Sequence, residues 1–171
     1  VAAIVAEYRA DVDLPQIIVA DTLAALQALA RDRRERSQAQ FFAITGSNGK
    51  TSTKEILQRL LQTRGQTLAT LGNLNNDIGV PLTLLRLRDE DRYAVIEMGA
   101  NHPGEIAALA ALARPDVALI TNVAPAHLAG FGTLEGVIAA KSEIYAHSDG
   151  AIVLNLDLPA AARWQDQFRD R

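Results

Sequence analysis

The sequence predicts an α/β fold, a mostly parallel, twisted sheet flanked by helices. From Phe41 onward, short apolar runs rich in β-branched residues alternate with stretches whose apolar residues recur at helical spacing. Repeated strand–helix units form parallel sheets because each helix carries the chain back across the sheet. With 171 residues, of which 49% are hydrophobic, the chain is about one domain long and can bury a substantial core.

The expected elements follow one another in a regular order. Before the alternating region, short strands at 1–6 and 16–20 surround a polar turn containing Pro15. Asp21 is a plausible N-cap for the helix that follows, and 37–40 is a polar linker. The later strands are expected at 41–45, 66–70, 93–98, 117–121 and 151–154, and the helices at 50–64, 79–87, 103–114, 134–147 and 158–169.

Composition excludes several classes of function. A net charge of −3 argues against a general nucleic-acid or membrane-surface binder. The apolar stretch 1–6 is cut off by Glu7, so we expect neither a signal peptide nor membrane insertion. The absence of cysteine suits a reducing cytoplasm. Because the chain starts at Val1 and its only methionine is Met98, we expect a fragment.

A glycine-rich loop joins the first strand of the alternating region to the helix after it. Gly46 and Gly49 allow the backbone to bend so that its N–H groups converge on an anion. Lys50 can reach terminal phosphates, and the Thr51 hydroxyl can hold Mg²⁺. The usual phosphate loop has four residues between its glycines and this one has two, so an ordinary strand-to-helix turn is the alternative. The position after an apolar strand favours a phosphate-binding loop.

Polar side chains close the next strands. Glu97 ends an apolar strand, where its charge requires compensation by a metal ion or a role as the cap of a helix starting at Pro103. Position alone does not separate these two interpretations. His127 follows the next strand, and a single loop histidine is usually a surface residue. The carboxyl ends of parallel strands meet at one edge, which would bring Thr51, Glu97 and His127 together.

Lys141 falls inside an apolar stripe. Steps of three and four residues place it between Val137 and Ile138 on one side and Ile144 and Tyr145 on the other. One interpretation is a lysine whose stem packs while its ammonium reaches water. The other is a lysine held near a charged site with a lowered pKa that permits covalent chemistry.

The loop 71–81 carries several amide side chains, including Asn75 and Asn76. These suit either turn and cap chemistry or hydrogen bonding to a sugar or peptide ligand, and the sequence does not separate the two.

Four stretches together resemble the Mur ligase family. They read TGSNGKTS at 45–52, GNLNNDIGVPLTLL at 72–85, EMGANHPGEI at 97–106 and NVAPAHLAGFGTLEGVIAAKSEI at 122–144. The first is shared by the whole family. The other three are similar to the member that joins D-Ala-D-Ala to UDP-N-acetylmuramoyl-tripeptide, and the resemblance covers nearly all of 17–160.

The resemblance implies an ATP-dependent amide ligase that acts through an acyl phosphate in peptidoglycan precursor synthesis. The implied cofactors are ATP and two Mg²⁺ ions, and the implied partners are the two small substrates, with a monomeric state. Asn75 and Asn76 would face the UDP-linked substrate, and Lys50, His127 and Lys141 would be catalytic. Lys141 would be carbamylated and would share the second Mg²⁺ with Glu97 and His127. The ATP loop would comprise Gly46, Ser47, Asn48, Gly49, Lys50, Thr51 and Ser52, with Thr51 at the first Mg²⁺.

By the same resemblance, residues 1–15 are the end of an N-terminal UDP-substrate domain and 16–40 link it onward. Residues 41–171 are a truncated, P-loop NTPase-like central ATP-binding domain. We expect this polypeptide alone to ligate nothing. The alternatives are another Mur-type or folylpolyglutamate-type ligase, or a non-catalytic P-loop nucleotide-binding module. The last leaves Glu97, His127 and Lys141 unexplained.

Overall fold

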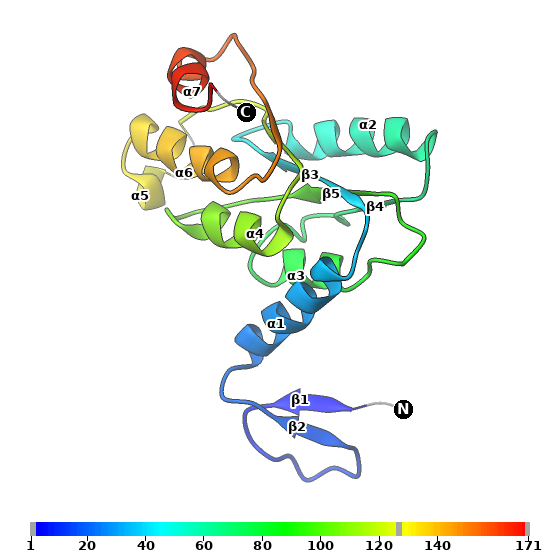
Figure 1. Cartoon of the computed structure of the whole chain (residues 1–171). Helices are drawn as coiled ribbons and strands as arrows, with labels where there is room; N and C mark the ends of the chain where they lie inside the picture. Colours follow the sequence, from blue (N-terminus) through cyan, green and yellow to red (C-terminus); the bar gives the residue numbers. More distant parts are fainter. Residues whose placement is uncertain (1–2, 126–127, 170–171) are drawn as a thin grey trace.

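The computed structural model describes residues 3–125 and 128–169, and within them the chain has a small N-terminal sheet and a larger α/β body (Figure 1). The small sheet pairs β1 (Ile4–Ala6) with β2 (Gln16–Ile18). The two strands are parallel, so the segment around Pro15 carries the chain back to the start of the sheet before β2 begins. Helix α1 (Thr22–Glu35) connects this sheet to the larger body, and the Asp21 carboxylate caps it by accepting from Ala24 N–H at 2.9 Å, as predicted.

The larger body contains a five-stranded, entirely parallel sheet in the order β4-β5-β3-β6-β7. This confirms the predicted α/β class. The strands are β3 (Gln40–Thr45), β4 (Thr67–Ala69), β5 (Tyr93–Glu97), β6 (Val117–Ile120) and β7 (Ala151–Val153). The helices are α2 (Lys50–Gln62), α3 (Gly79–Leu84), α4 (Glu105–Ala113), α5 (Leu128–Phe131), α6 (Leu134–Ala146) and α7 (Ala161–Gln167).

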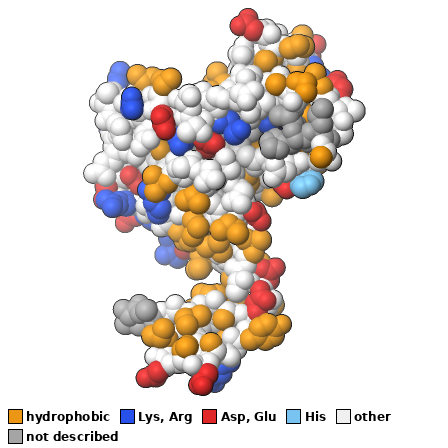
Figure 2. Space-filling view, turned by 180° about the vertical axis from the view of Figure 1, so that it is seen from behind, with side chains coloured by type: hydrophobic (Ala, Val, Ile, Leu, Met, Phe, Trp, Pro, Cys, Tyr) orange, Lys and Arg blue, Asp and Glu red, His pale blue; other side chains and the backbone are white. Residues whose placement is uncertain are grey.

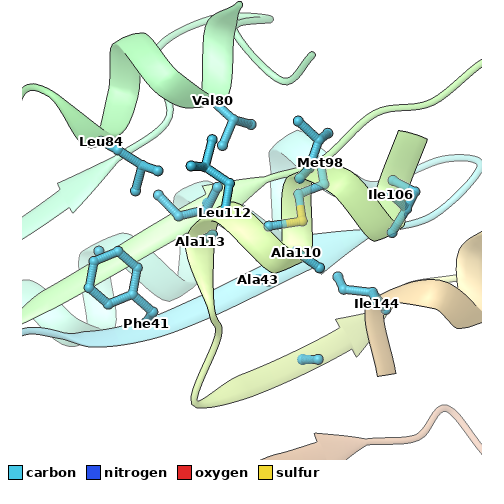
Figure 3. Packing of buried hydrophobic residues seen from close by; sticks show 14 of the residues in the cluster. Phe41, Ala43, Val80, Leu84, Met98, Ile106, Ala110, Leu112, Ala113 and Ile144 are labelled. Carbon is cyan, nitrogen blue, oxygen red and sulfur yellow. The ribbon is translucent and has the colours of Figure 1, made fainter. Parts of the chain in front are cut away.

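Helices cover both faces of this sheet. Alternation along β3 sends Phe41 and Ala43 to one face and Ile44 to the other. On the Ile44 face, α2 packs Leu57 and Leu61 against the sheet. The opposite face carries the larger core, in which α3, α4 and α6 meet the strands (Figure 3). Its labelled members include Val80, Leu84, Met98, Ile106, Leu112 and Ile144.

Several element boundaries differ from those expected. Helix α4 begins at Glu105, because Gly104 takes a left-handed backbone (φ +86°) that ends the turn after Pro103. Helix α7 begins at Ala161 and not at 158, and the four-residue helix α5 was not expected. The other strands and helices fall within one to three residues of the predicted limits.

Apolar side chains remain on the surface of the small sheet. Val5, Val12, Leu14, Ile17 and Ile18 are all exposed, and Figure 2 shows hydrophobic side chains gathered over this part of the molecule. Across 3–125 and 128–169, no helix combines the length and the apolar character needed to cross a bilayer.

Candidate active site

The glycine-rich loop runs from the end of β3 into α2 and is fastened to the end of β6. Gly46 (φ +154°) and Gly49 (φ +77°) both have backbone conformations that L side chains rarely adopt. A Cβ atom on Gly46 would also collide with the Thr121 hydroxyl. Ser47 N–H donates to the Asn122 carbonyl at 3.1 Å, and Asn48 N–H donates to the Asn122 side-chain oxygen at 2.8 Å. The loop is therefore held in one shape by its neighbour strand.

Helix α2 begins directly at the loop. Its N-cap is Gly49, and no side chain in the described part of the protein caps the helix, so within that part its first N–H groups have no side-chain acceptor. The Lys50 ammonium donates to the Gly46 carbonyl at 2.8 Å, which folds the lysine back over the loop. A curled loop, an uncapped helix N-terminus and an ammonium group together suit an anionic phosphate.

Glu97 is buried, with 2% of its surface exposed, and its carboxylate is fully engaged. One oxygen accepts from Asn75 Nδ2 at 2.9 Å, and the other accepts from the Thr51 hydroxyl at 3.0 Å. Glu97 therefore contacts the phosphate-loop helix α2. The helix-cap alternative is wrong, because α4 is capped by Glu143, which accepts from Gly104 N–H and Ala107 N–H.

Lys54 was missed by the sequence analysis. Its side chain is 4% exposed, and its Nζ lies 3.9 Å from the Glu97 oxygen that Thr51 contacts. The signal was present in the sequence, since Lys54 precedes Leu57 and Leu61 by three and seven residues and so lies on the apolar face of α2.

Lys141 is also buried, with 4% of its surface exposed, which excludes the interpretation of an ammonium reaching open water. Burial, and then the positive charge of Lys50, lower the pKa of Lys141 to about 8. Among the residues that the structure describes, no carboxylate lies within 4.0 Å of its ammonium. Because Lys141 is buried next to a second cation, its protonated form is disfavoured. The surroundings favour a neutral amine or a negatively charged derivative of that amine.

A cavity of about 590 Å³ connects the phosphate loop to Lys141. Asn75 and Asn76 lie on its wall, where Asn75 orients Glu97 and the Asn76 side-chain oxygen accepts from Gly79 N–H at 2.8 Å. The lining residues are Gln27, Arg31, Gly46, Lys50, Asn75, Asn76, Asp77, Gly99, Ala100, Asn101, Glu105, Ala108, Leu109, Ala111, Leu112 and Lys141. A second cavity of about 670 Å³ lies along β4 and contains none of the predicted site residues.

The structure thus brings four of the predicted residues to one rim of the sheet: Lys50 and Thr51 from the start of α2, Glu97 from the end of β5, and Lys141 from α6. Glu97 contacts Thr51, whereas its carboxylate lies more than 4.0 Å from the Lys141 ammonium. His127 lies outside the described residues. Within the described ranges, no three His, Asp or Glu side chains cluster as a ready-made metal site.

Residues 44–171 match the Mur ligase middle domain, so the chain belongs to the Mur ligase family. The chain is 52% identical, over 94% of its length, to the UDP-N-acetylmuramoyl-tripeptide–D-alanyl-D-alanine ligase of Escherichia coli K12. It is 42% identical, over 84% of its length, to the ligase of the same name from Bacillus subtilis 168.

Solved structures agree with this assignment. A MurF from Acinetobacter baumannii superposes on 97% of the chain with a TM-score of 0.91 and 44% identity. The MurF ligase of Thermotoga maritima in complex with ADP superposes on 99% with a TM-score of 0.84 and 35% identity. The chain spans 36% of the Escherichia coli ligase and 39% of the Thermotoga maritima chain.

Proposed function

We propose that this chain is the nucleotide-binding part of an ATP-dependent ligase that joins D-Ala-D-Ala to UDP-N-acetylmuramoyl-tripeptide. The observation that carries the proposal is the 52% identity, over 94% of the chain, to a ligase with that name. In this proposal residues 1–15 belong to an N-terminal UDP-substrate domain, 16–40 link the two domains, and 41–171 belong to the central ATP-binding domain. The enzyme works in the cytoplasm as a monomer on small-molecule substrates.

In the proposed mechanism, the loop 46–52 binds the phosphates of ATP through its N–H groups and the N-terminus of α2. Lys50 turns from the Gly46 carbonyl to the terminal phosphates. Thr51 and Glu97 would hold the first Mg²⁺, since their oxygens lie 3.0 Å apart and hard cations prefer hydroxyl and carboxylate ligands. That ion, when bound, neutralises charge on the phosphate oxygens.

The proposed role of Lys141 is that of a carbamate. Its neutral amine nitrogen would form a C–N bond to CO₂ and release one proton to water. A pKa of about 8 leaves about one-tenth of the amine neutral at pH 7, against about one in three thousand at the ordinary value. The carbamate would replace a buried cation beside Lys50 by an anion. Together with His127 it would hold the second Mg²⁺.

The reaction is the formation of an amide bond in two steps. The terminal carboxylate of the tripeptide attacks the γ-phosphorus of ATP and releases ADP, which gives an acyl phosphate. The amine of D-Ala-D-Ala then attacks the acyl carbon, and the bond to phosphate breaks. The amine nitrogen loses one proton as the amide forms. Lys50 accompanies the transferred phosphoryl group and counters its charge. Asn75 and Asn76 line the cavity along which the tripeptide would lie.

The proposal is tested with a chimera in which residues 1–171 replace the matching segment of the Escherichia coli ligase. We expect UDP-N-acetylmuramoyl-pentapeptide and one phosphate per turnover, detected by mass spectrometry and phosphate assay. The Lys50→Ala chimera is expected to lose at least about a hundredfold in kcat, because the transferred group loses its cation.

Two outcomes would contradict the proposal. A chimera that binds and slowly hydrolyses ATP, with no dependence on D-Ala-D-Ala, would identify a nucleotide-binding module. A chimera that accepts a glutamate or folate substrate instead would identify a folylpolyglutamate-type ligase.

A further inference from the structure

The chain has only three lysines among its 17 basic residues, and all three lie around the phosphate loop. Lys50 belongs to the loop, Lys141 lines the cavity next to it, and Lys54 is one turn further along α2. The other 14 basic residues are arginines. Lys54 is the one lysine for which the proposed mechanism has no use.

Lys54 is buried together with Glu97. Their side chains are 4% and 3% exposed, and Nζ lies 3.9 Å from Oε2. The other contacts of the carboxylate are with the Thr51 hydroxyl and the Asn75 amide, which are both neutral. Lys54 is therefore the positive charge that compensates Glu97 among the residues that the structure describes.

The Glu97 carboxylate, paired with Lys54, has to meet two opposing requirements. A buried carboxylate needs a counter-ion to fold stably, whereas a carboxylate that serves a metal ion must be free to exchange that counter-ion. At 3.9 Å, with no direct hydrogen bond between the two residues, Lys54 compensates the charge of Glu97 and leaves the oxygen bound only by the hydrogen bond from the neutral Thr51 hydroxyl. A compact ammonium on a flexible stem suits this arrangement better than a planar guanidinium.

We propose that Lys54 is a built-in counter-ion that keeps Glu97 aimed at Thr51 when Mg²⁺ is absent and competes with Mg²⁺ for that carboxylate. It is a positioning residue, and it sets a threshold so that the site fills when nucleotide phosphates add their own negative charge. This inference rests on the proposed role of Glu97 as a metal ligand. It concerns the metal-free chain, which the proposed ligase function does not address.

The test compares wild type, Lys54→Met, Glu97→Gln and the double variant, all as the 171-residue chain without nucleotide. Lys54→Met is expected to lower the thermal midpoint in EDTA by about 5 °C or more, because it leaves a buried charge uncompensated. Saturating Mg²⁺ is expected to restore much of that loss in Lys54→Met and to shift wild type little. In the Glu97→Gln background, Lys54→Met is expected to cost less and Mg²⁺ to restore nothing.

Metal affinity gives a second, independent reading. Mn²⁺ titrated by electron paramagnetic resonance is expected to bind Lys54→Met about tenfold more tightly than wild type, since the competing cation is gone. Lys54→Arg keeps the charge and is expected to bind Mn²⁺ no more tightly than wild type.

Three results would overturn the proposal. These are a loss of stability that Mg²⁺ does not relieve, an equal loss in both Glu97 backgrounds, or Mn²⁺ affinity that is unchanged or weaker in Lys54→Met. If Lys54→Met does not fold, the double variant is predicted to fold because it buries no uncompensated charge, and its failure would assign Lys54 a packing role. None of these readouts requires ligase activity, so failure of this inference can be distinguished from failure of the proposed function.

Discussion

The electrostatics of the site depend on three buried charged residues, Lys54, Glu97 and Lys141, which lie around the half-buried Lys50. Glu97 has Lys54 within 4 Å, and its remaining contacts come from neutral groups. Lys141 has no carboxylate within 4.0 Å among the described residues, and the charge that affects its pKa is that of another cation, Lys50. One buried charge is thus compensated within the protein and the other is not. Lys141 is therefore the buried charge without a counter-ion among the described residues, and it is the residue expected to be chemically modified.

Replacing Lys141 by methionine is expected to stabilise the chain at pH 7 in CO₂-free buffer by about 3 kcal/mol, since a pKa lowered from 10.5 to about 8 measures the cost of burying the charge. Below pH 8 both the folded and the unfolded chain carry the proton, so the full cost applies. Between pH 8 and 10.5 the unfolded chain alone holds it, and wild-type stability rises relative to the variant. Above 10.5 the difference disappears.

Urea unfolding of wild type and Lys141→Met between pH 7 and 10.5 measures this difference. Arg163→Met is the matched control, because Arg163 is an exposed cation whose effect should be constant over the same range. A wild type that is the more stable protein at pH 7, or a gap that widens as the pH rises, would contradict the burial account.

At the scale of the elements, the phosphate loop has its shape because β6 supports it. Ser47 and Asn48 both donate to Asn122, and the Thr121 hydroxyl donates to the Asn48 carbonyl at 2.7 Å. Gly46 passes so close to Thr121 that no side chain fits between them. The two-residue spacing between the glycines, shorter than in the usual phosphate loop, is consistent with a loop shaped by a neighbouring strand.

Gly46→Ala is expected to destabilise the chain by about 1–3 kcal/mol and to weaken ADP binding, because the added methyl group displaces the loop or the end of β6. Gly49→Ala is the control: its Cβ meets nothing within 4 Å, so it should cost only the strain of its positive φ, about 1 kcal/mol. Adding Thr121→Ala to Gly46→Ala should recover part of the loss. Chemical denaturation and calorimetry would measure both quantities, and equal effects for the two glycines would refute this account of the loop.

The sequence predicted the element order because each strand is apolar and each helix has an apolar stripe, as at Leu57 and Leu61. It did not predict the strand order β4-β5-β3-β6-β7 or the parallel pairing of β1 with β2. Both depend on contacts between residues far apart in the sequence, which local patterns do not show. For the site, position at a strand end drew attention to Glu97, and helical spacing drew attention to Lys141. Each residue kept two interpretations on the sequence pattern alone, and a role for it came only from the resemblance to the Mur ligase family. The contact between Lys54 and Glu97 could not be predicted, since it depends on how α2 is rotated over β5.

In the molecule as a whole, the parallel sheet brings functional side chains from α2, β5 and α6 to one rim. The strand ends bring Thr51 and Glu97 together, while α6 crosses the same rim and places Lys141 in the cavity with Lys50. The small β1–β2 sheet stands apart, reached through α1 (Figure 1). We therefore propose that phosphate, metal and a carbamylated lysine meet at this single rim.

The most direct measurement of that claim is ¹³C NMR of the chain in ¹³C-labelled bicarbonate. We expect one slowly exchanging carbamate resonance, absent in Lys141→Met, that broadens strongly when Mn²⁺ and a non-hydrolysable ATP analogue are added together. A carbamate signal that survives Lys141→Met, or one that stays sharp with Mn²⁺ and nucleotide bound, would contradict it.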